Sequence, residues 1–178
     1  MLLALLALCI WVYLFAARGR FWASGPELEP ALPAVAPDVD VIVPARNEAA
    51  TISPVIASLL AQHYPGRFRV LLVDDNSSDD TGALAGQAEE LRVLRLVDKP
   101  PGWSGKLYAL AQGVRATSAP LILFTDADIV HDPCHLATLV AKQERGNLGM
   151  VSEMVRLNCN SVAERALIPA FVYFFQIH

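Results

Sequence analysis

The chain has 178 residues, with 14 Lys and Arg, 18 Asp and Glu and a formal net charge of −4. A hydrophobic content of 54% excludes a disordered chain. The acidic balance argues against a nucleic-acid-binding protein, which needs a basic surface for the phosphates. The length suits one domain with a sizeable core. Because residues 1–17 are all apolar, we interpret the chain as a soluble-type domain behind an apolar leader.

Residues 1–17 are predicted to form a single transmembrane anchor, the alternatives being a signal peptide and a buried core helix. No charge precedes the apolar run and bulky side chains continue to its end, which disfavours a cleaved signal peptide. Arg18 and Arg20 follow at once, with Phe21 and Trp22 as interfacial residues. By the positive-inside rule this places the following domain on the cytoplasmic side of a membrane.

Residues 18–37 are predicted to be a stiff linker, because they contain four prolines. From Asp38 onward, β-branched runs alternate with helical stripes of apolar residues. The expected strands are 39–43, 68–73, 93–97 and 121–125, and the expected helices are 51–62, 81–91, 106–115 and 135–145. In the first helix, regular turns are expected from Pro54, with Ser53 as the N-cap. This alternation predicts an α/β fold with a mainly parallel sheet flanked by helices, and a ligand crevice along the carboxyl ends of the strands.

Three of the four predicted strands end in polar clusters, at residues 44–48 (PARNE), 74–79 (DDNSSD) and 126–128 (DAD). In an extended chain Asp126 and Asp128 point the same way, while the alanine between them points back toward the protein. Paired carboxylates of this kind suit Mg²⁺ or Mn²⁺ that also holds a diphosphate. The alternative is a solvated turn, because D-x-D alone is common.

The second cluster has two parts. Asp74 and Asp75 come at the strand tip, where they can accept hydrogen bonds from a base or ribose, whereas Asp79 or Asp80 is expected to cap the next helix. Lys106 opens a helix after a Gly- and Pro-rich loop, a position that suits a diphosphate or, alternatively, a solvated lysine. The absence of G-x-G-x-x-G and of a P-loop motif disfavours nicotinamide and P-loop functions.

Cysteine usage predicts a reducing compartment. Cys9, Cys134 and Cys159 are widely spaced and contain no C-x-x-C pair, so no disulfide framework is expected. The string His131 to His135 (HDPCH) matches no zinc signature, and we interpret it as a loop that leads into a helix.

Residues 41–48, 73–79 and 125–128, in this order and at these spacings, resemble the inverting family 2 glycosyltransferases of the GT-A fold. Residues 101–106 (PGWSGK), together with the apolar N-terminus, resemble the hopanoid-biosynthesis-associated glycosyltransferases, which are similar to ceramide glucosyltransferases. The resemblance extends from Asp38 to about Arg156.

The resemblance implies transfer of a sugar from a nucleotide-diphospho-sugar to an acceptor hydroxyl, with inversion and with Mg²⁺ or Mn²⁺ as cofactor. The donor-binding residues would be Pro44, Ala45, Arg46, Glu48, Asp74, Asp75, Lys106 and Asp126. Among these, Asp75 would contact the base, Lys106 would lie near the diphosphate, and Asp128 with Asp126 would hold the metal. The expected acceptor is a lipid or polyprenoid alcohol at a membrane, and no nucleic acid is expected as a partner.

The sequence departs from the family in its later motifs. The acidic motif that supplies the general base and the Gln-x-x-Arg-Trp motif are both missing, and Glu153 stands on a predicted strand without a neighbouring Asp. Residues 158–178, which contain the apolar stretch 166–175, are predicted to begin a membrane-associated segment. We therefore expect a fragment whose general base lies beyond residue 178. A nucleotidyltransferase of related fold and a non-catalytic, membrane-tethered scaffold that binds nucleotide-sugars are the alternatives.

Overall fold

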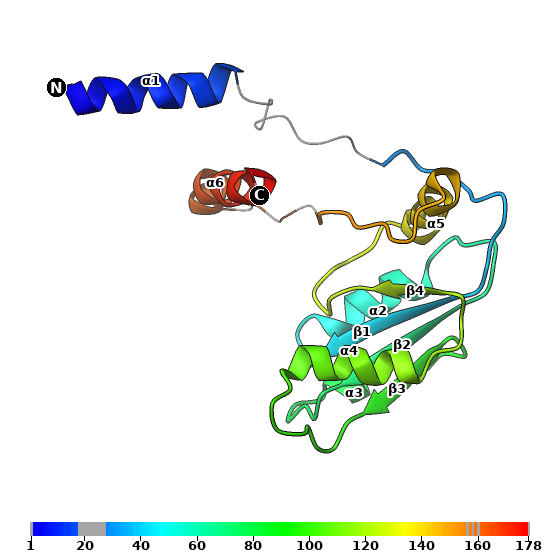
Figure 1. The fold of residues 1–178 in the computed structure, drawn as a ribbon. Coiled ribbons are helices and arrows are strands. Elements are labelled where there is room, and N and C mark those ends of the chain that lie inside the picture. Colours follow the sequence, from blue (N-terminus) through cyan, green and yellow to red (C-terminus); the bar gives the residue numbers. More distant parts are fainter. Residues whose placement is uncertain (1, 18–27, 156, 158, 160, 178) are drawn as a thin grey trace. The chain divides into compact units, whose positions relative to one another are not determined.

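Figure 1 shows a computed structural model of the chain, which contains a four-stranded sheet. The residues that it describes are 2–17, 28–155, 157, 159 and 161–177. The chain divides into two compact units, residues 29–152 and a second unit formed by residues 1–28 and 153–178. The predicted interfacial segment with Arg18, Arg20, Phe21 and Trp22 lies outside the described residues.

All neighbouring strands of the sheet run parallel. The strands are β1 (Val39–Ala45), β2 (Phe68–Asp74), β3 (Leu91–Arg95) and β4 (Leu121–Phe124), in the spatial order β3-β2-β1-β4. The register places the last residue of β1, Ala45, beside the last residue of β2, Asp74. The predicted mainly parallel sheet of an α/β fold is confirmed, and the carboxyl ends of β1 and β2 meet at one edge.

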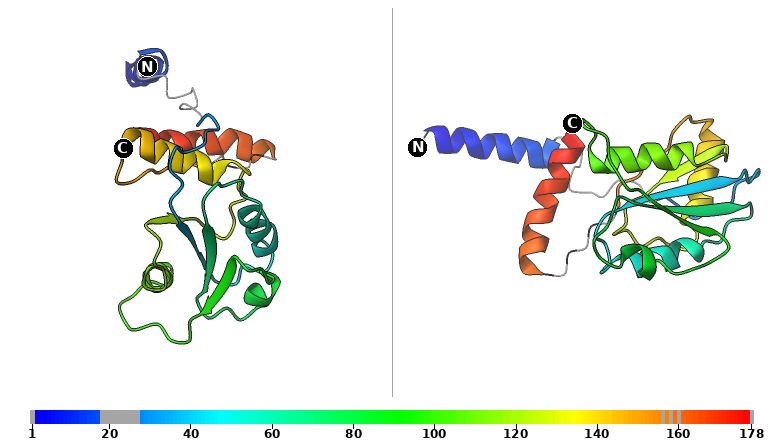
Figure 2. Two further views of the ribbon diagram at one scale, coloured as in Figure 1. Left: turned by 90° about the vertical axis from the view of Figure 1, so that its right-hand side faces the viewer. Right: turned by 90° about the horizontal axis from the view of Figure 1, so that it is seen from below.

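The helices cover both faces of this sheet. α2 (Ile52–Leu60) and α3 (Thr81–Leu84) connect strands that step from β1 outward to β3, whereas α4 (Gly105–Arg115) carries the chain back past β1 to β4. Because parallel crossovers are right-handed, connections that step in opposite directions place their helices on opposite faces. Figure 2 shows α4 on one face and α2 with α3 on the other. The order in which the chain adds strands to the sheet therefore reverses between β1 and β4. Ligands of open α/β sheets bind at such a reversal.

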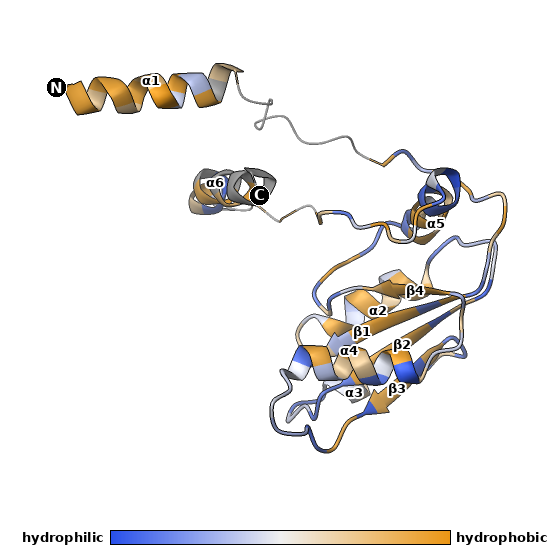
Figure 3. Cartoon of the chain, viewed as in Figure 1, coloured by the Kyte–Doolittle hydropathy of each residue, from blue (hydrophilic) through white to orange (hydrophobic). Residues whose placement is uncertain are grey.

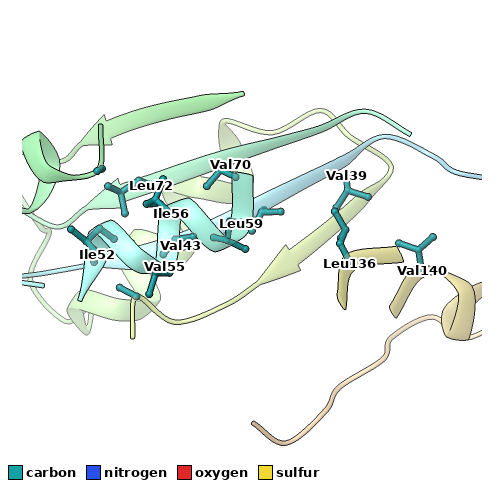
Figure 4. Close-up of a cluster of buried hydrophobic side chains, with 14 residues drawn as sticks. Val39, Val43, Ile52, Val55, Ile56, Leu59, Val70, Leu72, Leu136 and Val140 are labelled. Atoms are coloured by element: carbon teal, nitrogen blue, oxygen red, sulfur yellow. The ribbon is translucent and has the colours of Figure 1, made fainter. Parts of the chain in front are cut away.

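The core is built on β1 and β2, most of whose residues are buried on both faces of the sheet. Figure 3 shows the apolar residues of these strands in orange. Val41 and Val43 of β1 pack on the α2 side, whereas Ile42 between them packs with Ala109 of α4. α5 (His135–Gly146) adds Leu136 and Val140 to the α2 side, as drawn in Figure 4. This packing fixes α4 and the end of β1 relative to each other.

Two predicted helices differ from the observed ones. α2 begins at Ile52, before Pro54, because a proline in the first turn lacks only an N–H that the helix leaves unpaired anyway. Ser53 is not the N-cap, since its hydroxyl donates to the carbonyl of Leu84. α3 ends at Leu84 and not at residue 91, because Gly86 takes a φ of 83° that an α-helix does not continue through.

The bounds of all four strands also differ from prediction. β1 ends at Ala45 and β2 at Asp74, two residues and one residue later than predicted. β3 spans Leu91–Arg95, two residues earlier than predicted, because its pairing with β2 runs from Val70 to Asp74. β4 ends at Phe124, one residue early, and residues 151–155 around Glu153 form no strand.

The second half of the predicted linker packs on α5. The backbone N–H groups of Ala34 and Val35 donate to the carboxylate of Glu144 at 2.7 and 3.0 Å, and the N–H of Ala31 donates to the Thr138 hydroxyl at 3.3 Å. Residues 29–37 are thus a strap on the sheet-containing unit and not a free spacer.

The other unit contributes two helices of 16 residues each, α1 (Leu2–Ala17) and α6 (Val162–Ile177). Ser161 and Glu164 form a capping box at the start of α6, each accepting a hydrogen bond from the backbone N–H of the other. Within the described residues no helix is long and apolar enough to cross a membrane. The predicted transmembrane anchor over residues 1–17 is therefore not supported, since 16 residues span about 24 Å and a bilayer core is about 30 Å thick.

Candidate active site

A cavity of about 350 Å³ opens at the carboxyl ends of β1 and β4. The described residues that line it are Pro44, Ala45, Arg46, Glu48, Asp75, Gly105, Lys106, Ala109, Asp126, Ala127 and Asp128. They come from the segment after β1, the tip of β2, the start of α4 and the turn after β4. The cavity therefore brings together every predicted sugar-donor and metal residue except Asp74.

β1 extends past the end of β4, and this opens the cavity. Ile42 is the last β1 residue paired with β4, and its carbonyl accepts a hydrogen bond from the N–H of Thr125. Pro44 lies two residues further along β1, so its nitrogen points to the same edge of β1 as the carbonyl of Ile42. β4 has already ended there, so no neighbouring strand needs the N–H that proline lacks. The chain after β4 is thus free to turn away and to place its carboxylates opposite the end of β1.

The loop after β1 is bonded to the loop after β2. The backbone N–H groups of Asn47, Glu48 and Ala49 donate to the side chains of Ser77 (3.0 Å), Thr81 (2.8 Å) and Asp79 (3.2 Å). In return, the side-chain oxygen of Asn47 accepts from the N–H of Ser78 at 2.9 Å, and Asn47 itself takes a left-handed φ of 57°. These bonds hold one wall of the cavity. From the sequence alone, the only role predicted for residues 76–81 is helix capping by Asp79 or Asp80.

Of the two predicted capping residues of α3, Asp80 stands at the N-cap position, but the side chain that bonds the first helical residue is that of Asp79. It accepts hydrogen bonds from both the hydroxyl and the N–H of Thr81, and these bonds lower the pKa of the Asp79 carboxyl. Asp80 makes no side-chain cap bond.

Asp74 and Asp75, the adjacent aspartates after β2, have different positions and different contacts. Asp74 is buried outside the cavity lining, where Oδ1 accepts from the N–H of Ser77 at 2.9 Å and Oδ2 lies 3.7 Å from Nε of Arg95. Asp75 lines the cavity, with Oδ2 at 3.7 Å from Nη1 of Arg46. Asp74 thus fixes the turn and Asp75 presents its carboxylate to the cavity.

Both carboxylates of the D-x-D motif reach the cavity, while Ala127 between them is buried in the core. The backbone conformation that brings both carboxylates to the cavity differs from the predicted extended one. The segment is not an extended continuation of β4, because residues 127 and 128 form a turn. On the cavity side, Nζ of Lys106 lies 2.6 Å from Oδ1 of Asp126.

The donor set of the cavity fits a hard divalent cation. The lining contains four carboxylates and only two cationic side chains, so an anionic diphosphate needs additional positive charge to enter. No group of three or more His, Cys, Asp or Glu side chains able to hold a metal ion is found within the described residues. Asp126 and Asp128 would supply two oxygen ligands, and diphosphate oxygens and water would supply the others, as is usual for Mg²⁺.

A histidine pair lies behind the D-x-D turn. His131 is buried, its Nε2 lies 2.9 Å from the hydroxyl of Thr125, and its Nδ1 lies 3.0 Å from Nδ1 of His135. Burial, with a smaller contribution from His135, lowers the pKa of His131 to about 4. His131 does not line the cavity, and α5 begins at His135, as expected for a loop that leads into a helix.

Comparison with known proteins identifies the family. The profile of glycosyl transferase family 2 matches residues 40–170. An uncharacterized glycosyltransferase of Mycobacterium tuberculosis is 33% identical over 108 residues, which cover 61% of this chain and 44% of that protein. The beta-monoglucosyldiacylglycerol synthase of Trichormus variabilis is 35% identical over 120 residues, which cover 65% of this chain and 25% of the synthase. The chain thus spans less than half the length of these two relatives.

A solved structure supports the same assignment. The mannosyltransferase PcManGT from Pyrobaculum calidifontis, in complex with GDP-Man and Mn²⁺, is 27% identical with a TM-score of 0.59. The match covers 79% of this chain and 42% of the mannosyltransferase. Sequence profile and fold agree, and the chain belongs to glycosyl transferase family 2.

Proposed function

We propose that this chain binds a nucleotide-diphospho-sugar in the cavity, as part of an enzyme that transfers the sugar to an acceptor hydroxyl with inversion at the anomeric carbon. The observation that carries the proposal is the placement of Asp75, Lys106, Asp126 and Asp128 around one cavity at the β1/β4 edge. The mannosyltransferase of similar fold was solved with a nucleotide-sugar and Mn²⁺, which supports the same ligand class here.

The nucleotide occupies the end of the cavity formed by β1 and β2. Pro44, Ala45, Arg46 and Glu48 line it, and the bonded loops behind them keep this wall in place before the nucleotide arrives. Asp75 accepts a hydrogen bond from the base. Asp74 positions Asp75 by closing the turn through the N–H of Ser77 and does not touch the nucleotide.

The diphosphate and sugar occupy the other end. Asp126 and Asp128 hold a Mg²⁺ or Mn²⁺ ion, and when bound this ion offsets the negative charge that develops on the departing nucleoside diphosphate. Asp126 also faces the ribose and the donor sugar. Lys106 contributes an ammonium group to the diphosphate from the first turn of α4.

The general base is not one of the cavity carboxylates in this proposal. Asp126 and Asp128 are committed to the sugar and the metal, and Asp75 to the nucleotide. Glu48 lines the nucleotide end and accepts a hydrogen bond from the Thr51 hydroxyl, so none of the four is available to take the acceptor proton. Glu153 stands without the neighbouring Asp of the family's acidic motif. We place the base beyond residue 178, and we therefore expect the 178-residue chain to bind the sugar donor without transferring the sugar.

The acceptor is proposed to be a lipid or polyprenoid alcohol at the cytoplasmic face of a membrane. Two observations support this: the relative named a beta-monoglucosyldiacylglycerol synthase, and the apolar character of α1. The finer resemblance of residues 101–106 to hopanoid-associated enzymes remains a prediction. Good turnover of the full-length protein with soluble sugars, and none with lipid extracts, would contradict a lipid acceptor.

Calorimetric titration of the purified chain with UDP, GDP and their sugar conjugates, with and without Mn²⁺, tests the proposal. We expect one nucleoside diphosphate to bind only when Mn²⁺ is present. If no nucleotide binds under either condition, the cavity is not a nucleotide-sugar site and the proposal fails. A sugar product formed by residues 1–178 alone would refute only the placement of the base.

A further inference from the structure

The ion pair between Lys106 and Asp126 joins two elements across the cavity. Lys106 is the second residue of α4, Asp126 follows β4, and Nζ lies 2.6 Å from Oδ1. The Lys106 side chain is 61% exposed and that of Asp126 is 50% exposed, so neither is held by burial. The pair is therefore a contact that a competing ligand can exchange at low cost.

The backbone on either side of this pair is fixed, so only the side chains can respond to a ligand. Ala109, one turn after Lys106, is fully buried against the sheet, and Ala127, next to Asp126, is buried in the core. Lys106 also stands in the first turn of a helix, where the helix dipole disfavours a positive charge. The ammonium group is therefore stabilised by the Asp126 carboxylate across the cavity and not by its own helix.

The partner of Lys106 is one of the two carboxylates proposed to hold the metal. Of the two cationic side chains that line the cavity, Arg46 lies beside Asp75 and Lys106 lies beside Asp126. While Lys106 neutralises Asp126, a divalent cation that arrives alone meets a carboxylate that already has a counter-ion. An ammonium group has three donors and no acceptor, so it can leave a carboxylate for a phosphate oxygen without a change of protonation.

We propose that Lys106 is an exchangeable counter-ion, which occupies Asp126 in the empty cavity and transfers to the diphosphate when metal and sugar donor bind. This inference rests on the proposed function and adds a regulatory property to it. Metal alone binds weakly because it must displace the ammonium group. Metal together with a nucleoside diphosphate binds well, because the diphosphate gives the displaced ammonium a new partner.

The test is a calorimetric titration of the purified chain with Mn²⁺ alone, and with UDP or GDP in the presence of Mn²⁺. For Lys106→Gln we expect Mn²⁺ alone to bind about three- to tenfold more tightly than to the wild type, and the nucleoside diphosphate to bind at least about tenfold more weakly. Lys106→Met should behave in the same way, and Lys106→Arg should keep the weak binding of Mn²⁺ alone.

Lys99→Gln is the matched control. Lys99 lies in the loop before α4, its Nζ donates to the carbonyl of Trp103 at 2.5 Å, and its loss changes the net charge by the same amount. We expect this variant to bind Mn²⁺ like the wild type. Equal tightening in Lys99→Gln and Lys106→Gln would overturn the inference, because it would show a general charge effect, and so would unchanged or weaker Mn²⁺ binding by Lys106→Gln. If the wild type binds neither UDP nor GDP with Mn²⁺, the proposed function itself fails, and the counter-ion exchange fails with it.

Discussion

The carboxylate of Asp75 fills the space that a side chain on Gly105 would need. A β-carbon at residue 105 would lie 2.5 Å from Oδ2 of Asp75, closer than such atoms approach in folded proteins. Gly105 is the first residue of α4, so the absence of its side chain lets the amino end of a helix meet a cavity carboxylate. That end carries partial positive charge from unpaired N–H groups, which favours the ionised carboxylate.

Gly105→Ala should weaken nucleotide binding and leave the stability of the fold nearly unchanged. Alanine favours the helix by about 1 kcal/mol over glycine, so the loss of stability should be small. The new methyl group must displace Asp75 or the start of α4, and we expect nucleoside diphosphate affinity in Mn²⁺ to fall by about tenfold, the value of one charge-assisted hydrogen bond. Calorimetry measures the affinity and urea denaturation measures the stability.

Gly82→Ala is the control for this change. Gly82 lies in the first turn of α3, and a β-carbon there would be 3.4 Å from Oδ2 of Asp74, an ordinary contact. Its nucleotide affinity should match the wild type. If both variants keep wild-type affinity, the contact between Asp75 and Gly105 does not matter for binding.

Asp128→Asn should abolish most of the metal-dependent nucleotide binding. Asp128 is exposed in the cavity and is proposed to ligate the metal, and an amide oxygen is a far weaker ligand than a carboxylate for a divalent cation. We expect the affinity for UDP or GDP in Mn²⁺ to fall at least about tenfold. Asp132→Asn is the control, because Asp132 accepts from the N–H of Cys134 in the turn before α5 and an asparagine oxygen can keep that bond. Equal affinities of the two variants would contradict the metal assignment.

The position of the site could be predicted from local sequence, because the carboxyl ends of parallel strands meet at one edge. The polar clusters after β1, β2 and β4 therefore had to lie near one another once the strands were located. The burial of Ala127 between two cavity aspartates could also be predicted, although a turn and not an extended strand produces it.

Other features depend on contacts between distant segments, which no local pattern encodes. Asp74 and Asp75 are chemically identical neighbours, and only the turn and Arg95 on β3 decide which of them faces the cavity. The pairing of Lys106 with Asp126 depends on the packing of α4 against the sheet. The prolines of residues 18–37 predict a stiff linker, but the bonds of residues 34 and 35 to Glu144 are not visible in the sequence.

Asp40→Asn should destabilise the fold without changing nucleotide binding. Asp40 is buried in β1 and accepts hydrogen bonds from Nε and Nη2 of Arg69, both at 2.9 Å, and from the N–H groups of Ser118 and Ala119. Burial raises the pKa of the Asp40 carboxyl, but these bonds outweigh it and the pKa is lowered overall. Losing the charge should cost about 1–3 kcal/mol in the free energy of unfolding.

The pH dependence of the Asp40 contribution follows from the sign of its pKa shift. The folded pKa lies below the usual aspartate value of 3.8, so the stabilisation is complete above that value and is lost as the pH falls through the folded pKa. The difference between wild type and Asp40→Asn should therefore shrink in acid. Asp40 is not part of the cavity lining, so a change in nucleoside diphosphate affinity would contradict a purely structural role.

His131→Gln should flatten the pH dependence of stability between pH 6.5 and about pH 4. Burial lowers the pKa of His131 from 6.5 to about 4, so in this range the unfolded chain binds a proton that the folded chain does not. Wild-type stability should therefore fall as the pH falls, by at most about 3 kcal/mol across the window. Glutamine keeps a polar group near the Thr125 hydroxyl and removes the titration.

The measurement is the free energy of urea unfolding between pH 6.5 and about pH 4. His63→Gln, at an exposed position, is the control that should keep the wild-type slope. A slope unchanged by His131→Gln would contradict the assignment of the acid sensitivity to His131.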